Sequence, residues 1–291
     1  MTEYSMIGFS DEMTADLQLT GHQTSQVMSA YAMGVLIGAP VLAILGAKLN
    51  RHTLLAYLLL WCASANLFTS FAQSYEQLRL LRIFNGFPHG IYFSTAALLI
   101  YDLFPKHKRA SCIGMMFAGI GMALLMIVPL TTYFGEIQDW RAIFRVIALM
   151  DLLIIILLHD LIPDLPTQAA PSGWREFKTL KHPLLWWILA LSTTAICGRM
   201  AIFAYAAPLV TEVALLPATK LPLIVICGGV GTVVGFLLGG YLADKNALKT
   251  LWYSLLWCLL VMVVFQMLIP HTQLSYLAFF LLGTFMLIVP S

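Results

Sequence analysis

Long apolar stretches follow one another along the whole chain, separated by short polar segments. A membrane-spanning helix needs about 20 mostly apolar residues. By this criterion the sequence predicts nine full spans, at residues 23–46, 53–72, 79–104, 110–134, 141–163, 183–211, 221–243, 250–270 and 273–290. Residues 1–9 resemble the last part of one further span. The pattern therefore predicts an all-α polytopic membrane protein.

The composition agrees with a protein that lies mostly in lipid. Of its 291 residues, 60% are hydrophobic and 10% are charged, whereas soluble domains carry about 25% charged residues. The mean hydropathy is +0.86. The five cysteines lie inside apolar stretches and lack the spacing of metal ligands, so we interpret them as reduced core residues.

The basic residues are concentrated in one of the two alternating sets of loops. Ten of the 16 Lys and Arg residues fall in loops that follow every second span. The positive-inside rule places these loops in the cytoplasm. The loop at residues 10–22 contains acidic residues but no Lys or Arg, so we expect it on the outside.

A Pro-rich basic segment divides the spans into two groups. We expect residues 1–163 to form an N-terminal transmembrane bundle and residues 183–291 an incomplete C-terminal bundle. Residues 164–182 are then a cytoplasmic linker, with a short surface helix at residues 174–180.

The two groups contain similar sequences at an offset of 197 residues. The stretch "GVLIGAPVLAILGAKLNRHTLL" begins at Gly34 and "GTVVGFLLGGYLADKNALKTLW" begins at Gly231; the same offset pairs Gly86 with Gly283. Two parallel six-helix repeats are one known plan of transporters. The start of the first helix and the last two helices of such a plan have no counterpart here. We therefore expect a truncated copy, which inserts into a membrane but does not transport by itself.

Five stretches, in this order, carry a resemblance to a known family: "MTEYSMIGF", "SAYAMGVLIGAP", "RIFNGFPHG", "VPLTTYFGEIQDWRAIF" and "GGYLADK". Together they resemble the major facilitator superfamily, and within it the bacterial drug/proton antiporter branch that includes sugar- and arabinose-efflux-like permeases. The resemblance implies two pseudo-symmetric six-helix bundles and secondary active transport. Two departures weaken the implied direction of transport. The loop "GAKLNRH" lacks the family's aspartate, and the residues around Pro129 lack the glycines of the antiporter signature.

One predicted span carries a stripe of polar residues. Arg82, Asn85 and His89 are spaced by three and four residues, which places them on one helical face. A charge at the bilayer centre costs at least about 2.5–3.5 kcal/mol. We therefore expect the stripe to face a water-filled cavity between the two bundles. The alternatives are that Arg82 extends to the outer interface and that His89 only bonds a neighbour.

Four ionisable residues in the predicted spans are candidates for proton coupling: Glu3, Arg82, His89 and Asp151. The resemblance implies that Glu3 lies on a helix that lines the cavity, where a partly buried carboxyl can load and release a proton. The alternative is a carboxylate at a helix end that faces water. The sixth helix is peripheral in the resembling fold, so Asp151 either carries protons or has a structural partner.

Further candidates would contact the solute or gate its access. Asn85, Arg199 and Tyr31 are candidates for the substrate cavity, Arg199 because the resemblance places it on the seventh helix, the partner of the first. Asp244 and Lys245, in the family's loop motif, are expected to gate transport by contacts that hold one access state closed.

These observations predict a carrier that exports a small organic solute in exchange for protons by alternating access. We expect a monomer in the bacterial inner membrane that uses no cofactor or metal and binds no nucleic acid. No phosphate loop, nucleophile–base set or metal cluster supports an enzyme. The alternative is a non-transporting receptor or accessory protein, or an inactive transporter fragment.

Overall fold

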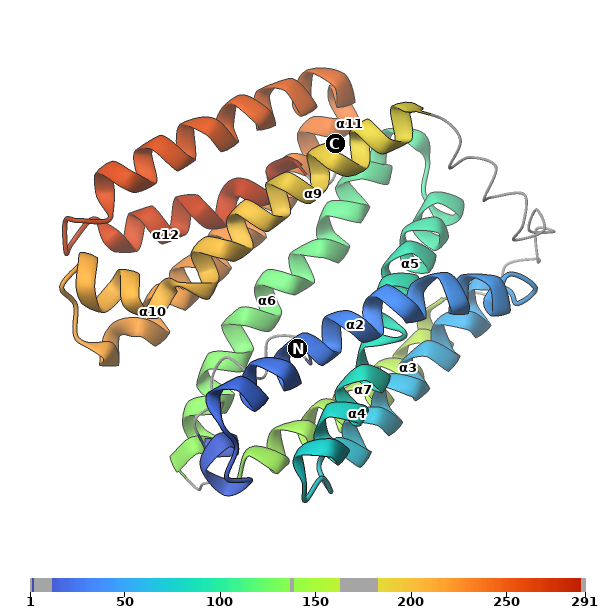
Figure 1. The fold of residues 1–291 in the computed structure, drawn as a ribbon. Helices are drawn as coiled ribbons and strands as arrows, with labels where there is room; N and C mark the ends of the chain where they lie inside the picture. Colours follow the sequence, from blue (N-terminus) through green and yellow to red (C-terminus); the bar gives the residue numbers. More distant parts are fainter. Residues whose placement is uncertain (1, 3–11, 137–138, 163–182, 289–291) are drawn as a thin grey trace. The chain divides into compact units, whose positions relative to one another are not determined.

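The computed structural model describes residues 2, 12–136, 139–162 and 183–288 (Figure 1). Helices are the regular elements of these residues. The longer ones are α2 (Gly21–Gly46), α3 (Arg51–Thr69), α4 (Tyr75–Gly86), α5 (His89–Leu103), α6 (Arg109–Glu136), α7 (Trp140–Leu161), α9 (Pro183–Ala204), α11 (Leu221–Leu268) and α12 (Ser275–Thr284). The short ones are η1 (Lys106–Lys108), α10 (Ala206–Pro208), η3 (Leu209–Val213), η4 (Ala218–Lys220) and η5 (Phe285–Ile288).

Polar capping residues fix where several of these helices begin. The side chains of Thr20, Asn50, Ser74 and Asp139 each accept a hydrogen bond from the backbone N–H three residues later. Such caps satisfy donors that have no partner within the helix. Between the caps the sequence is apolar, and five of the described helices are long and apolar enough to cross a membrane.

The predicted span at residues 79–104 is wrong as one continuous helix. The structure ends α4 at Gly86 and begins α5 at His89. Pro88 lacks the N–H that would bond to the carbonyl of Phe84 in a continuous helix. The indole nitrogen of Trp61 on α3 donates to that carbonyl instead, at 2.9 Å. The break is therefore stabilised by a neighbouring helix.

In the second half of the chain, one predicted pair of spans agrees with the structure and one predicted boundary differs. Residues 221–243 and 250–270 lie on either side of Asn246, whose backbone is not helical (φ −163°, ψ 95°), so α11 contains two helical stretches. The span predicted at residues 183–211 is helical in α9 only as far as Ala204, after which α10 and the π-helical η3 follow. Residues 1–9, apart from Thr2, and the predicted linker lie outside the described residues.

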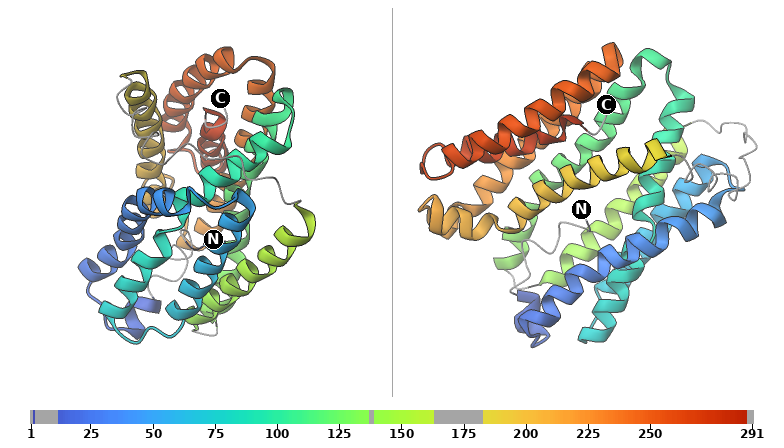
Figure 2. Two further views of the ribbon diagram at one scale, coloured as in Figure 1. Left: turned by 90° about the vertical axis from the view of Figure 1, so that its right-hand side faces the viewer. Right: turned by 45° about the horizontal axis from the view of Figure 1, so that its top comes forward.

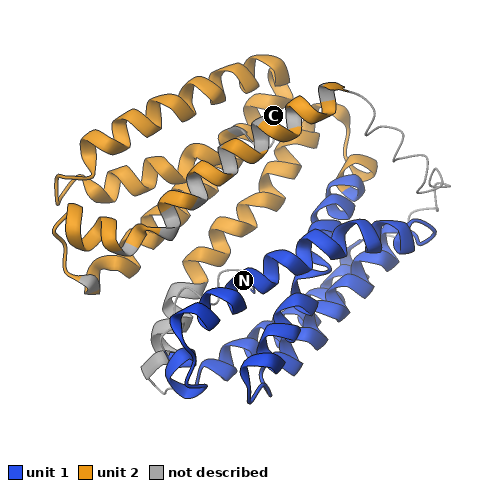
Figure 3. Cartoon of the chain, viewed as in Figure 1, with its two compact units in different colours: residues 1–99, 129–179 blue, residues 100–128, 180–291 orange. Residues whose placement is uncertain are grey.

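The chain forms two compact units (Figure 3). Unit 1 contains Met1–Leu99 and Pro129–Thr179, and unit 2 contains Ile100–Val128 and Leu180–Ser291. In unit 1, α2 packs on α4, and α3 packs on both α4 and α7 (Figures 1 and 2). In unit 2, α11 packs on α12 and η5.

The structure repeats its closest helix contacts at the offset found in the sequence. A Cβ atom at Gly34 would lie 2.0 Å from the carbonyl oxygen of Ile83, and one at Gly231 would lie 2.0 Å from that of Phe280. Both glycines therefore let two backbones touch. Three further pairs of contacts keep the offset: Gly86 with Tyr31 and Gly283 with Gly228, Gly38 with Phe87 and Gly235 with Thr284, and Gly34 with Gly86 and Gly231 with Gly283. These contacts confirm the predicted internal repeat.

Candidate functional site

Arg82 lies inside unit 1 and does not extend to its surface. The residue is 1% exposed. Its Nη1 donates to the backbone carbonyl of Thr2 at 3.0 Å, and its guanidinium lies over the ring of Tyr31, 4.8 Å from the centroid. The hydroxyl of Tyr31 and Nδ1 of His89 are 2.9 Å apart. The break after α4 thus brings together side chains from α2, α4 and α5.

A cation–π contact helps to compensate the burial of the Arg82 charge. Such contacts contribute about 2 kcal/mol or more when the cation is removed from water. The burial of Arg82 does not agree with the alternative interpretation, in which its side chain extends to the outer interface. Its fixed charge is instead available to act on groups inside unit 1.

Asn85 faces a different neighbour from Arg82. It is 3% exposed, and its Nδ2 donates to the hydroxyl of Thr69 on α3 at 2.9 Å. Thr69 in turn donates to the carbonyl of Ala65 at 2.7 Å. Among the described residues, Oδ1 of Asn85 has no hydrogen-bond partner. The predicted single stripe is therefore divided, and Asn85 contributes a buried acceptor on the side of α3.

Asp151 on α7 joins the same group of side chains through a residue that the sequence analysis missed. Asn66 is fully buried, and its Nδ2 donates to Oδ2 of Asp151 and to the hydroxyl of Thr2, each at 3.1 Å. Thr2 also accepts from Arg82 through its carbonyl. A usable signal existed, because Asn66 is the one side-chain amide in the apolar span at residues 53–72.

We call these connected residues the unit 1 network: Asp151, Asn66, Thr2, Arg82, Tyr31 and His89. They come from α2, α3, α4, α5 and α7 and from Thr2. The candidate Glu3 lies outside the described residues. Arg199 lies on α9 of unit 2, and its side chain is not among the described ones.

Two of the buried polar positions on α4 have apolar counterparts in unit 2. The offset of 197 pairs Arg82 with Phe279 and Asn85 with Leu282, and both apolar residues are fully buried. The repeat can therefore fill these positions with hydrocarbon. Packing of the repeat therefore does not require the buried charge of Arg82 in unit 1.

Asp244 caps the start of α6 from a distant part of unit 2. Its carboxylate accepts from the backbone N–H groups of Ala110 and Ser111, each at 2.9 Å, and from the Ser111 hydroxyl. A negative charge at this position also interacts favourably with the helix dipole. Lys245 is exposed, and its ammonium lies 4.2 Å from the ring centroid of Tyr241. Of the two gating candidates, Asp244 thus joins two helices of unit 2.

A second polar cluster in unit 1 joins Asp16 to the start of α7 and to the loop after α3. Asp16 accepts from Arg141 at 2.7 Å and from the indole of Trp140 at 3.1 Å. Arg141 also donates to the carbonyl of Ala72 at 2.8 Å. The hydrogen bond from Arg141 is the main reason why the pKa of Asp16 is lowered, against the opposing effect of burial.

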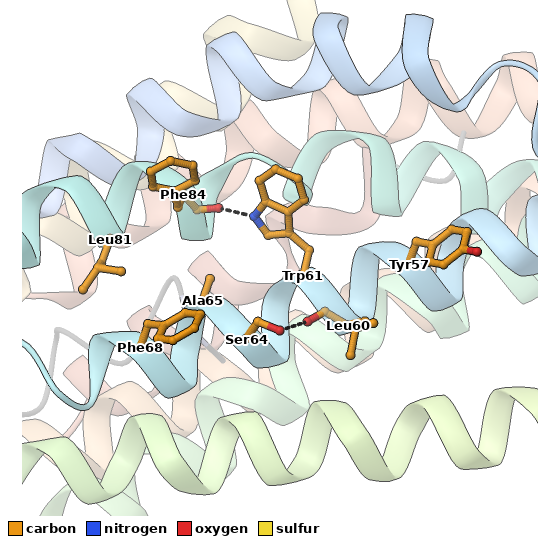
Figure 4. Close-up of a pocket in the computed structure, with 8 residues that line it drawn as sticks. All are labelled: Tyr57, Leu60, Trp61, Ser64, Ala65, Phe68, Leu81 and Phe84. Carbon is orange, nitrogen blue, oxygen red and sulfur yellow. Dashed lines mark hydrogen bonds between the residues drawn. The ribbon is translucent and has the colours of Figure 1, made fainter.

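An apolar groove lies between α3 and α4 (Figure 4). Its volume is about 570 Å³, and it is lined by Tyr57, Leu60, Trp61, Ser64, Ala65, Phe68, Leu81 and Phe84. The hydroxyl of Ser64 donates to the Leu60 carbonyl and the indole of Trp61 to the Phe84 carbonyl. Since these bonds stay within the protein, the groove presents mainly hydrocarbon. Among the described residues no group of three or more His, Cys, Asp or Glu could hold a metal ion.

Comparison with known sequences places these features in one family. A sequence model of the Major Facilitator Superfamily matches residues 1–291. The "Uncharacterized MFS-type transporter YtbD" of Bacillus subtilis is 26% identical over 283 residues, which cover 97% of this chain and 72% of that protein. The "Inner membrane transport protein YdhP" of Escherichia coli is 29% identical over 264 residues, 90% of this chain and 67% of that protein.

A Helicobacter pylori protein whose name describes a sugar efflux transporter is 27% identical over 254 residues, 87% of this chain and 65% of that protein. The chain thus spans about two thirds of the length of these relatives.

Two solved structures show the same fold. One is a bacterial homologue of the human lysosomal transporter Spinster, with a TM-score of 0.63 and 15% identity, covering 99% of this chain and 70% of that one. The other is the human organic anion transporter MFSD10, with a TM-score of 0.63 and 17% identity, covering 98% of this chain and 74% of that one.

Proposed function

The chain belongs to the Major Facilitator Superfamily, and we propose that it is a secondary active transporter that exports a small organic solute in exchange for protons. The family consists of multi-pass membrane transporters and not of enzymes. The single observation that carries the proposal is the burial of Arg82 in contact with Tyr31 and Thr2, in a network that ends at Asp151. Intramembrane ionisable residues that pair with one another mark proton and substrate pathways.

Proton coupling requires a group that changes its charge and a second group that responds. Asp151 can change its charge, whereas Arg82 keeps its charge at any physiological pH. Protonation of the carboxyl removes a negative charge that is linked to the buried guanidinium through Asn66 and Thr2. An interaction that changes by about 1.4 kcal/mol changes a two-state equilibrium about tenfold. Such a change is sufficient to favour one access state over the other. Glu3 remains a second candidate carboxyl in this proposal.

A solute rich in hydroxyl groups fits the polar atoms of unit 1. Oδ1 of Asn85 is a buried acceptor that has no partner among the described residues. The Tyr31–His89 pair offers a hydroxyl and a ring nitrogen. The Helicobacter pylori relative is named for sugar efflux. We therefore propose a sugar-like solute, with Tyr31 and Asn85 as contact residues and Arg199 as a further candidate on α9.

The cap on α6 is proposed to act as a gate. Asp244 holds the start of α6 by three hydrogen bonds. Release of these bonds would leave backbone donors of α6 without partners, which gives the capped arrangement an energetic advantage. Lys245 is proposed to assist from the exposed side. The proposal further places a monomer in a bacterial inner membrane, with two bundles divided by the segment at residues 164–182.

Sugar accumulation in inverted membrane vesicles tests the proposal. The vesicles would carry the complete gene product that contains this sequence, or the 291-residue chain in parallel. Respiration acidifies their interior, so an exporter accumulates a radiolabelled pentose or hexose inside them. We expect accumulation that a protonophore abolishes. The absence of accumulation with all sugars and cationic drugs tried would contradict export and favour a non-transporting receptor, accessory protein or inactive fragment.

A further inference from the structure

We infer that Asn66 is a positioning residue for proton coupling, whose amide hydrogen-bonds Asp151 in both charge states and links that carboxyl to Arg82 through Thr2. The inference deepens the proposed function and rests on it. Asn66 itself carries no proton. Its role is to hold the carboxyl in a fixed place and to transmit its change of charge.

The contacts of Asn66 reach both sides of the network. Its amide nitrogen donates to Oδ2 of Asp151 on α7 and to the hydroxyl of Thr2, each at 3.1 Å. Its amide oxygen accepts from the same hydroxyl at 3.3 Å. Thr2 accepts from Nη1 of Arg82 at 3.0 Å. Asn66 is therefore placed between the group that can change its charge and the group that cannot.

An amide can serve a carboxyl group in either protonation state. To an ionised carboxylate it donates through its NH₂ group, and from a protonated carboxyl it accepts through its carbonyl. Changing from one to the other requires a half-turn of the amide. The hydroxyl of Thr2 can donate or accept, so it can follow that turn. When a proton binds Asp151, a covalent O–H bond forms on its carboxyl group. The hydrogen bond that the Asn66 NH₂ group donates to Asp151 is then lost, and the Asn66 carbonyl accepts a hydrogen bond from the new O–H group. The Thr2 hydroxyl exchanges its roles of donor and acceptor.

Two ionisable side chains among the described residues lie near Asp151. Cys62 of α3 and Tyr92 of α5 lie close enough to feel its charge. Within the described part of the chain, Arg82 of α4 is linked to it through Thr2 and Asn66. Among the described residues, a side-chain hydrogen bond to Asp151 comes from Asn66. The amide is thus the group best placed to respond to a change at this carboxyl.

A merely structural role does not account for a buried amide at this position. A buried polar group costs free energy unless it is hydrogen-bonded. At the offset of 197 the equivalent residue of unit 2 is Val263, which is 58% exposed, so the repeat itself does not require a buried amide there. Leucine has the branched shape of asparagine, with two methyl groups in place of the amide oxygen and nitrogen, and would occupy the site without the hydrogen bonds. Asparagine is therefore required by its partners in unit 1.

Infrared difference spectroscopy of the purified chain tests the inference without a transport assay. Spectra recorded at acidic and alkaline pH contain the C=O band of the protonated Asp151, identified by its loss in Asp151→Asn. A hydrogen bond to the carboxyl lowers the frequency of this band. We expect Asn66→Leu to move it to higher frequency, whereas Asn66→Gln keeps it near the parent position. Ser64→Ala is the matched control, because Ser64 bonds only its own helix.

A band at the parent frequency in Asn66→Leu, or no Asp151 band at all, would overturn the inference. Asn66→Ser serves as a second variant if the leucine variant fails to fold, and thermal melting in detergent checks both. In vesicles, Asn66→Leu is expected to lower proton-driven sugar accumulation about tenfold or more, the effect of losing a charged hydrogen bond. Downhill exchange should persist. No accumulation by the parent contradicts the proposed function, whereas equal accumulation by parent and variant contradicts only the role of Asn66.

Discussion

The cap that Asp244 places on α6 leads to the most quantitative prediction for unit 2. Asp244→Ala removes acceptors for two backbone N–H groups and one hydroxyl. Loss of an N-cap costs about 1 kcal/mol, and loss of a partly buried charge at a helix end costs up to about 2 kcal/mol. We expect the first turn of α6 to be destabilised by about 2 kcal/mol relative to its open form.

Hydrogen exchange measured by mass spectrometry reads this change directly. A loss of 2 kcal/mol raises the population of the locally open state about 30-fold, and the amides of Ala110 and Ser111 should exchange faster by that factor. Asp244→Asn keeps an acceptor but removes the charge, so we expect a smaller increase of about fivefold. Lys249→Gln is the control, because Lys249 is exposed and its side chain is not part of the cap.

Unchanged exchange at the start of α6 in Asp244→Ala would refute the cap. Equal acceleration along all of α11 and α12 would also refute it, because the effect would then be a general loss of stability in unit 2. A control variant that exchanges as fast as Asp244→Ala would show that any charge change in this segment loosens α6.

Three further predictions concern unit 1 and α6. Gly34→Ala places a Cβ atom 2.0 Å from a backbone carbonyl oxygen, so it should lower the stability by about 1–3 kcal/mol and the melting temperature with it. Gly119→Ala, whose Cβ atom would meet nothing within 4 Å, should leave the melting temperature unchanged or raised. Arg141→Gln should remove about 0.2–1 kcal/mol of ion-pair energy at neutral pH. Since this bond lowers the pKa of Asp16 below 3.8, the difference from the parent should decrease as the pH falls through that lowered pKa, to the part that comes from the Ala72 carbonyl. A difference in thermal melting that is constant with pH would contradict the pairing. Trp61→Phe leaves a carbonyl of α4 without its donor and should cost about 1–3 kcal/mol in denaturant unfolding, with an equally stable variant as the contrary result.

The hydrophobic pattern was sufficient to predict the helical fold and the repeat. Apolar length alone locates most spans, because a bilayer imposes a minimum length on every helix. The glycine spacing predicted the paired contacts of Gly34 and Gly231, since only glycine lets two backbones approach so closely. The break at Pro88 was not predicted, although a proline inside an apolar span is a known signal for one.

The candidate site was harder to predict because its contacts join distant parts of the sequence. The spacing of Arg82 and His89 on one face was visible, but their meeting at Tyr31 depends on how α2 packs on α4. Asn66 and Asp151 are 85 residues apart, and no local pattern connects them. Pairing of this kind follows from helix packing, which periodicity does not encode.

Proton-driven sugar accumulation by Arg82→Gln, beside Arg79→Gln, tests the central claim most directly. Both arginines lie on α4, but Arg82 is 1% exposed. The side chain of Arg79 is 46% exposed, and its contacts with Glu76 and the ring of Tyr75 lie within the first turns of the same helix. In vesicles that contain equal amounts of folded protein, Arg82→Gln is predicted to lose uphill accumulation, and Arg79→Gln to match the parent. Accumulation by Arg82→Gln at the parent rate would contradict a proton-coupling role for the unit 1 network.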